Sequence, residues 1–449
     1  MKERLKSGAL VFLVASSLVQ TYFLIYRLPG SDSVLTSETN YVKTESMGQE
    51  KKIENLVFPD KMLIHQGGKK HTVFYPGVAF YDLIYTRLES RSFNNFQRRS
   101  IQSADWARIR SENEGIELSF SGGVPVSLLE RVMRLTPDSV FQGETINRIW
   151  IYIDEKNAKP HALFFSARGD VVYEANQFDM TVEDVKQHVN FGKNAPLYEL
   201  VDNQYYIPVN DLETVQPVVY AGLFTTEQMQ RNLFFDPGIT RNIQEKDGSQ
   251  IYTDSKRSLQ IKQDQRWMSY TDPSAPGASG SSPIRDVLAA VDFVNQHGGW
   301  DASYQLKMRS SDENRTSVLF QQYYGAYPVL DTPSFRFGTI ALQIQQETAS
   351  VYDRSLLYLK GGEQSSKKVM LPGGETLKKQ LETIGKGKTI RDLTPVYQPE
   401  LTNDGLKLVP EWRVTLGDGS VAEIHAVPVT TASTALNSPQ TQLSQETKK

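Results

Sequence analysis

The sequence contains no cysteine among its 449 residues. This absence excludes disulfide bonds, a lipid-modified cysteine anchor, thiol catalysis and cysteine-ligated zinc. A basic stripe is also lacking, since the formal net charge is −3 and the two signs are interspersed along the chain. Proteins that bind nucleic acid commonly present such a stripe to the phosphates. Nucleic acid is therefore not an expected partner.

Recognisable catalytic motifs are lacking as well. The sequence has no G-x-S-x-G, H-E-x-x-H or Walker pattern. Its carboxylates are scattered, which leaves open an anchored enzyme that acts on the cell wall. The aromatic pairs Tyr205-Tyr206 and Tyr323-Tyr324 leave open an exported ligand-binding module. We predict a protein that is not an enzyme and that needs no cofactor and no metal.

One pair of histidines raises the question of a metal site. His65 and His71 flank Gln66 to Lys70, a turn-type sequence that predicts a hairpin. The two imidazoles are then expected to face each other, but a zinc site needs a third ligand and no neighbouring cluster supplies one. We therefore interpret the pair as two partly exposed polar residues beside a turn.

A single long apolar run lies near the N-terminus. Residues Gly8 to Tyr26 carry no charge, and Lys2, Arg4 and Lys6 precede them. A helix of this length is roughly 28 Å long, enough to cross the hydrocarbon core of a bilayer. No small-x-small cleavage site follows, so we predict a retained signal anchor. The basic tip predicts a cytoplasmic N-terminus and an extracytoplasmic C-terminal bulk at the cell membrane.

The predicted transmembrane helix has a polar stripe on one face. This stripe includes Ser16, Ser17, Gln20 and Thr21. Small and hydroxyl side chains allow close approach of other membrane helices, and a glutamine in lipid favours an interhelical hydrogen bond. Alternatively, the hydroxyls bond to carbonyls of their own helix and Gln20 reaches the outer interface. Both interpretations stay open.

The rest of the chain is predicted to be α+β. Strand and helix patterns alternate without a regular βαβ order, and the strongest helix begins after Ser282, its predicted cap, and ends at His297. We predict about three exported domains. The expected segments are 1–28 (cytoplasmic tip and transmembrane anchor), 29–55 (tether), 56–211 (N-terminal exported α+β), 212–271 (central domain with hairpins), 272–282 (linker), 283–429 (C-terminal α+β domain) and 430–449 (disordered tail).

A set of short sequences, taken in order, resembles the YycH family. The set begins with the N-terminal anchor and Tyr205-Tyr206-Ile207-Pro208. Its densest part comprises Leu233 to Asp236, Arg241, Glu245, Asp247-Gly248 and Tyr252 to Asp254. Thr394 to Tyr397 and Pro410 to Trp412 are similar to the family's C-terminal region. One departure is Ser255, where a turn-favouring glycine is expected.

This resemblance implies a function. YycH-like proteins of Gram-positive bacteria are extracytoplasmic regulators of the WalK (YycG) sensor histidine kinase, whose two-component system controls cell-wall homeostasis. The resemblance implies that this chain binds and restrains such a kinase together with a YycI-like protein. It also implies that the C-terminal domain is similar to YycI. The expected partners are therefore the kinase, the YycI-like protein and the membrane, crossed once.

The densest part of the resemblance contains a candidate exported patch, formed by Asp236, Arg241 and Tyr252. As a binding patch it would contact a partner or an exported ligand. As a structural group it would cap a helix and pin a hairpin, with Arg241 paired to a carboxylate. Because Asp-Pro-Gly and Asp-Gly are turn sequences, we favour the structural interpretation.

Overall fold

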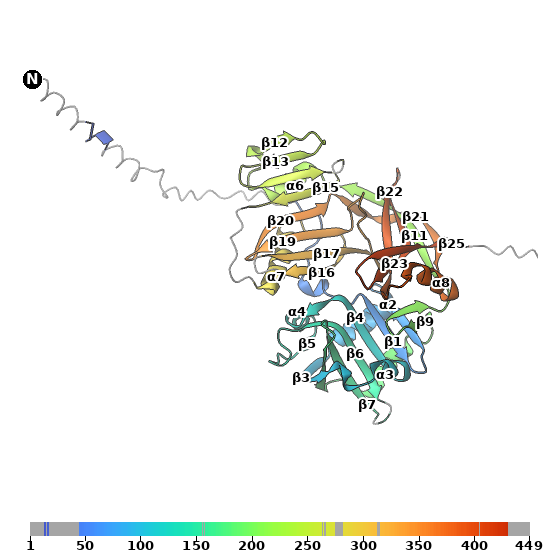
Figure 1. The fold of residues 1–449 in the computed structure, drawn as a ribbon. Helices are drawn as coiled ribbons and strands as arrows, with labels where there is room; N and C mark the ends of the chain where they lie inside the picture. Colours follow the sequence, from blue (N-terminus) through green and yellow to red (C-terminus); the bar gives the residue numbers. More distant parts are fainter. Residues whose placement is uncertain are drawn as a thin grey trace, which may run out of the picture. The chain divides into compact units, whose positions relative to one another are not determined.

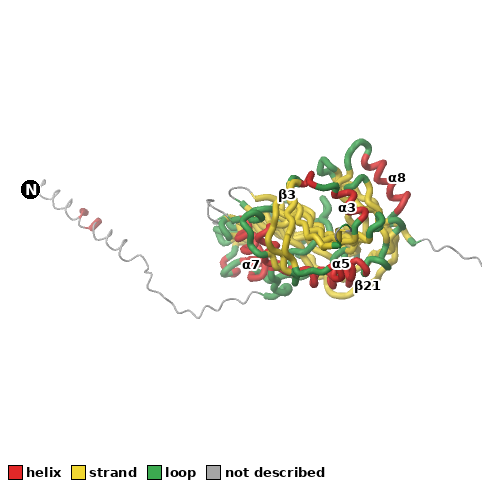
Figure 2. Tube along the Cα trace, turned by 90° about the horizontal axis from the view of Figure 1, so that it is seen from below, coloured by secondary structure: helices red, strands yellow, loops and turns green. Residues whose placement is uncertain are grey.

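The structure is a computed structural model that describes residues 13–14, 16–17, 45–154, 156, 158–262, 264, 266–273, 282–311, 315–403 and 405–429. Residues 45–429 belong to one compact unit. Strands make up most of this unit, and the helices are short and lie beside the sheets (Figure 2). The predicted α+β class is therefore confirmed, with more sheet than helix.

The first sheet contains ten strands formed by the described residues between 61 and 208 (Figure 1). Its neighbours pair antiparallel, apart from a parallel pair at the β3–β5 end. In spatial order the strands are β10 (Tyr205–Pro208), β9 (Leu197–Val201), β2 (His71–Phe74), β1 (Lys61–Gln66), β4 (Glu114–Pro125), β6 (Thr145–Asp154), β7 (Lys159–Ser166), β8 (Val171–Phe178), β3 (Ser92–Ser100) and β5 (Arg134–Leu135).

Two features of this sheet follow directly from the sequence pattern. The turn at Gln66 to Lys70 joins β1 and β2, with His65 opposite His71. Three consecutive β-rich runs form the antiparallel meander β6–β7–β8. The accompanying helices are α2 (Ala79–Glu89), α3 (Trp106–Glu112), α4 (Val126–Val132) and α5 (Val182–Asn190), and single 3₁₀ turns occupy η1 (Ile53–Asn55) and η2 (Ile101–Ser103). The hairpin is confirmed as predicted.

The second sheet contains nine strands of the described residues and combines two separate parts of the chain. In spatial order they are β12 (Arg241–Gln244), β13 (Gln250–Thr253), β14 (Ser258–Lys262), β15 (Trp267–Thr271), β20 (Thr348–Ser355), β19 (Thr339–Gln345), β17 (Thr316–Tyr324) and β16 (Ser303–Ser311), with β18 (Tyr327–Pro328) beside β17. Helix α7 (Pro283–Gln296) packs on β17, β19 and β20. Ser282 is its N-cap residue, but its side chain makes no capping hydrogen bond, contrary to our expectation.

The pairing of β15 with β20 differs from the predicted domain plan. These strands lie on either side of the segment 272–282, which we expected to link two domains. Residues 274–281 lie outside the described residues. The segment leads from β15 to helix α7, which packs on the same sheet, and its loop-like composition does not reveal whether strands on either side of it pair with each other.

A third sheet contains six strands of the described residues. It pairs β11, which begins at Leu212, with strands from the C-terminal part of the chain. Its strands are β22 (Ile390–Leu401), β23 (Leu406–Leu416), β11 (Leu212–Leu223), β21 (Leu357–Leu371), β25 (Val427–Pro428) and β24 (Val421–His425), the last of which pairs with β23. Helix α8 (Gly374–Gly385) contacts β10 of the first sheet. The predicted central segment 212–271 is thus divided between two sheets.

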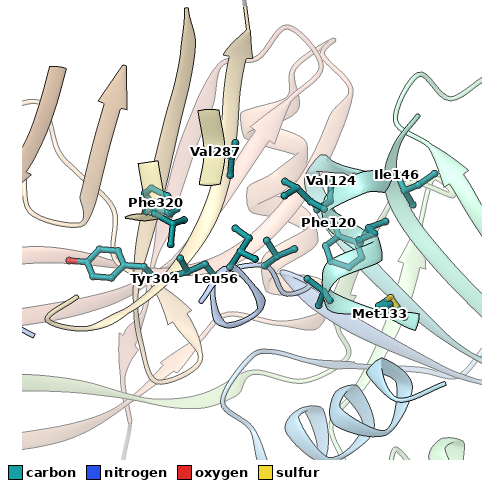
Figure 3. Packing of buried hydrophobic residues seen from close by; sticks show 14 of the residues in the cluster. Leu56, Phe120, Val124, Met133, Ile146, Val287, Tyr304 and Phe320 are labelled. Atoms are coloured by element: carbon teal, nitrogen blue, oxygen red, sulfur yellow. The ribbon is translucent and has the colours of Figure 1, made fainter. Parts of the chain in front are cut away.

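One apolar cluster is shared by the ten-stranded and nine-stranded sheets. Leu56, which is fully buried, lies between Phe120 and Val124 of β4 and the side chains of Tyr304 and Phe320 (Figure 3). Its carbonyl also accepts the N–H of Leu306 in β16 at 2.6 Å. The two sheets therefore stabilise each other through a common core.

The first described stretch of this unit, residues 45–56, packs on the nine-stranded part of the fold. The Glu45 carboxylate pairs with Arg231 at 2.7 Å. Gln49 forms a bridge with Trp300, and the Lys51 N–H donates to the side chain of Asn295 at 3.0 Å. The N-terminal end of the unit is thus fixed to residues that lie about two hundred positions later in the sequence.

Candidate functional site

Two of the four residues of the predicted transmembrane stripe lie outside the described residues. Ser16 and Ser17 are described and are helical, whereas Gln20 and Thr21 are not described. Within the described part of the chain, no helix has the length and apolar character needed to cross a bilayer. The membrane-facing role of these four residues stays a prediction.

The candidate patch follows a helix that a capping box begins. In α6 (Thr226–Leu233), the Thr225 hydroxyl accepts the N–H of Gln228, and the Gln228 side chain accepts the N–H of Thr225 at 2.8 Å. This reciprocal cap stabilises the first turn. The helix ends at Phe234, which is buried. The chain then enters the 3₁₀ turn η3 (Pro237–Ile239).

Asp236 and Tyr252 stabilise the turns and strands of the patch. The Asp236 carboxylate accepts the N–H of Gly238 at 2.9 Å and so caps η3. The Tyr252 hydroxyl on β13 donates to Gln250 at 2.8 Å and accepts from the Asn242 amide of β12 at 3.4 Å. Partial burial raises the pKa of this hydroxyl, which keeps it a donor at neutral pH.

Arg241 does not fit the structural interpretation. It is exposed at the start of β12, and the ion pairs found among the described residues include none to its guanidinium. The expected pairing of Arg241 with a carboxylate is therefore absent in this part of the chain. No hydrogen bond within the described residues joins Asp236, Arg241 and Tyr252 to one another. Their shared role as a partner-binding patch stays a prediction.

Three large apolar side chains beside Arg241 are exposed. The exposed fractions are 78% for Phe235, 63% for Ile239 and 52% for Ile243. Their exposure could not be predicted from the sequence, because Phe-Phe and isolated isoleucines are usually core residues. Three large exposed apolar side chains between residues 235 and 243 favour an interaction surface in this segment. We name Phe235, Ile239, Arg241 and Ile243 the β12 patch.

A second polar group lies buried in the first sheet. His65 and His71 are 0% and 1% exposed, so our expectation of partial exposure is wrong. Their Nδ1 atoms lie 2.9 Å apart. The Nε2 atom of His65 lies 3.1 Å from the Glu117 carboxylate of β4. Both rings also pack against Tyr206 of β10.

Two arginines neutralise the buried carboxylate of this group. Arg110 of α3 contacts Glu117 at 3.1 Å, and Arg148 of β6 contacts it at 3.0 Å. Burial alone would raise the pKa of Glu117, but the two guanidinium groups lower it well below its usual range. Glu117 is therefore ionised. Glu117 could not be identified as a buried ionised residue from the sequence, because its partners come from three separate segments.

Burial keeps both imidazoles neutral. It lowers the pKa of His65, although Glu117 opposes the effect. Burial, followed by the neighbouring His65, lowers the pKa of His71 to about 3. One Nδ1 atom must then donate and the other accept. Among the described residues, no group of three or more histidine or carboxylate side chains is arranged to hold a metal ion.

The family comparisons agree with the sequence resemblance over both halves of the chain. The model of the YycH protein N-terminal domain matches residues 3–193, and the model of the YycH protein C-terminal domain matches residues 202–426. Together they leave few residues between 3 and 426 unmatched.

YycH of Bacillus subtilis is similar to this chain along nearly its whole length, in sequence and in structure. The two-component system WalR/WalK regulatory protein YycH of Bacillus subtilis is 23% identical over 451 residues, covering 94% of this chain and 96% of that protein. The crystal structure of YycH from Bacillus subtilis superimposes with a TM-score of 0.66 at 18% identity. It covers 84% of this chain and 98% of the other. The structural similarity indicates a shared fold.

Proposed function

The chain belongs to the YycH family, and on this premise we propose that it regulates a WalK-type sensor histidine kinase by binding, without catalysis. The observation that carries the proposal is the continuous match to both family domains, together with a relative named as a WalR/WalK regulatory protein. Regulation of the cell wall through this kinase, by restraint, and cooperation with a YycI-like protein belong to the same proposal.

We further propose that the protein is a single-pass membrane protein with a cytoplasmic N-terminus. The uncharged run Gly8 to Tyr26 and the basic residues before it support this topology. A signal outside the membrane alters a kinase only if the bound regulator has different affinities for two kinase states. Helix packing inside the bilayer supplies one route to such a difference.

The stripe on the predicted transmembrane helix provides the test. In the full-length protein, Ser16, Ser17, Gln20 and Thr21 are replaced by leucine. Association with the kinase is then measured by co-purification from membranes, and kinase output by phosphorylation of its response regulator. We expect a loss of association of about fivefold or more, because interhelical hydrogen bonds in membranes contribute roughly 1 kcal/mol each.

The matched control carries leucine at Val11, Ala15 and Tyr22 on the opposite face of the predicted helix. This variant should retain wild-type association. Equal association and output in the stripe variant and the control would remove the transmembrane stripe from the mechanism. Absence of any kinase association in the wild-type protein would contradict the proposed function itself.

A further inference from the structure

The outer strand of the nine-stranded sheet, β12, is paired on one side only (Figure 1). It pairs with β13, and no strand of the described residues lies beyond it. All four of its residues are exposed. Natural sheet edges are commonly protected by proline, lysine or a bulge, because unpaired main-chain groups recruit other strands. β12 is short and carries Arg241, but it contains neither proline nor lysine and its register with β13 is regular.

The alternation of hydrogen bonds in the hairpin identifies the outward-facing main-chain groups. The Glu245 N–H donates to the Ser249 carbonyl at 2.9 Å, at the base of the turn. Hydrogen-bonded and non-hydrogen-bonded pairs alternate along an antiparallel ladder, so residues 243 and 241 face β13. The N–H and C=O groups of Asn242 and Gln244 therefore face away from the sheet. They supply donors and acceptors at the spacing of an added strand.

The apolar part of the β12 patch adds contact area at this edge. Ile243 lies opposite Ile251 of β13 in the register, and its side chain is half exposed. Ile239 and Phe235 lie just before the strand and are more exposed still. An added strand with apolar side chains would remove these groups from water, which favours binding.

The charge at the edge specifies the partner further. The ion pairs found among the described residues include none to Arg241, which is exposed at the N-terminal end of β12. An antiparallel strand would place its own C-terminal end opposite this arginine. A carboxylate at that position would pair with it.

We propose that β12 receives an extended segment of the kinase as an additional antiparallel strand. The segment carries alternating apolar side chains and a carboxylate near its C-terminal end. This inference rests on the proposed function for the identity of the partner, and it adds the surface and the mode of binding. Affinity comes from the main-chain bonds of Asn242 and Gln244, and register comes from Arg241 and Ile243.

The test uses the full-length protein in lipid nanodiscs. The probes are fluorescent peptides of about twelve residues that tile the predicted extracytoplasmic region of the kinase, with binding measured by anisotropy. Gln244→Pro removes an outward N–H while leaving the bonds to β13 in place. Gln244→Thr keeps that N–H and serves as the control. Urea unfolding verifies that both variants remain folded.

We expect at least one peptide of the stated pattern to bind the wild-type protein. Gln244→Pro should weaken it about tenfold, and Gln244→Thr should not. Arg241→Glu should weaken it similarly, and replacing the peptide carboxylate by lysine should restore binding to that variant. Failure of every peptide to bind, or equal binding to both Gln244 variants, would overturn the proposal. Self-association of the wild-type protein that Gln244→Pro abolishes would assign the edge to a second copy and would overturn it too.

A parallel measurement distinguishes failure of docking at β12 from failure of the proposed function. Kinase co-purification is recorded for the wild-type protein and for Gln244→Pro in the same membranes. Equal co-purification with both proteins overturns docking at β12 and leaves regulation by binding in place. No co-purification with the wild-type protein overturns regulation by binding, whatever the peptides do.

Discussion

At the scale of single residues, the buried pair His65 and His71 makes stability depend on pH. Both imidazoles are neutral in the folded protein, because burial lowers their pKa values, that of His71 to about 3. In the unfolded chain they titrate near 6.5. The stability contributed by this difference is present above pH 6.5. It is lost as the pH falls from about 6.5 towards 3, because the unfolded state then binds more protons.

The variant His71→Gln tests this dependence. The free energy of unfolding in urea is measured at pH 8 and pH 5 for both proteins, so that the cost of the substitution itself is subtracted. We expect the wild-type protein to lose about 2 kcal/mol more than the variant between these pH values. Equal losses in the two proteins would show that His71 binds its proton equally well in the folded and unfolded states, and would contradict a lowered pKa.

At the scale of elements, the capping box should stabilise the first turn of α6. Thr225→Ala removes the hydroxyl that accepts the Gln228 N–H, and we expect a loss of about 1 kcal/mol with faster hydrogen exchange in the first turn of α6. Thr226→Ala, inside the helix, serves as the control. Unchanged exchange in the Thr225 variant would contradict a stabilising role for the box.

Elements of this kind were largely predictable because their signals are local. The box at Thr225, the turn at Asp247-Gly248 and the apolar face of α7 each depend on residues within a few positions of one another. The buried group around Glu117 was not predictable in the same way. A glutamate within a strand reads as exposed unless its partners are known, and Arg148 lies far along the chain.

At the scale of the whole molecule, the ten-stranded and nine-stranded sheets should unfold together. Leu56 lies in their common core, so Leu56→Ala leaves a cavity in contact with both. We expect a loss of about 2–5 kcal/mol and a single transition, followed by the fluorescence of Trp150 in one sheet and Trp267 in the other. Leu401→Ala at an exposed position is the control. Two separate transitions would contradict a shared core.

Sheet membership is the part of the fold that the sequence concealed. Alternating apolar residues indicate a strand, but the period of two is the same whichever strand lies alongside. β15 pairs with a strand about eighty residues later, and β11 pairs with β21 across an even longer separation. Such non-local pairings depend on how the apolar faces of all the strands and helices are buried together.

The attachment of residues 45–56 has a mechanical consequence. Tension applied to the chain ahead of Glu45 would be received first by Arg231, Trp300 and Asn295, and only afterwards by the ten-stranded sheet. The contacts of this segment would have to break before the force reached the N-terminal strands. A pulling force would therefore act on α6, from which the chain continues through η3 into β12.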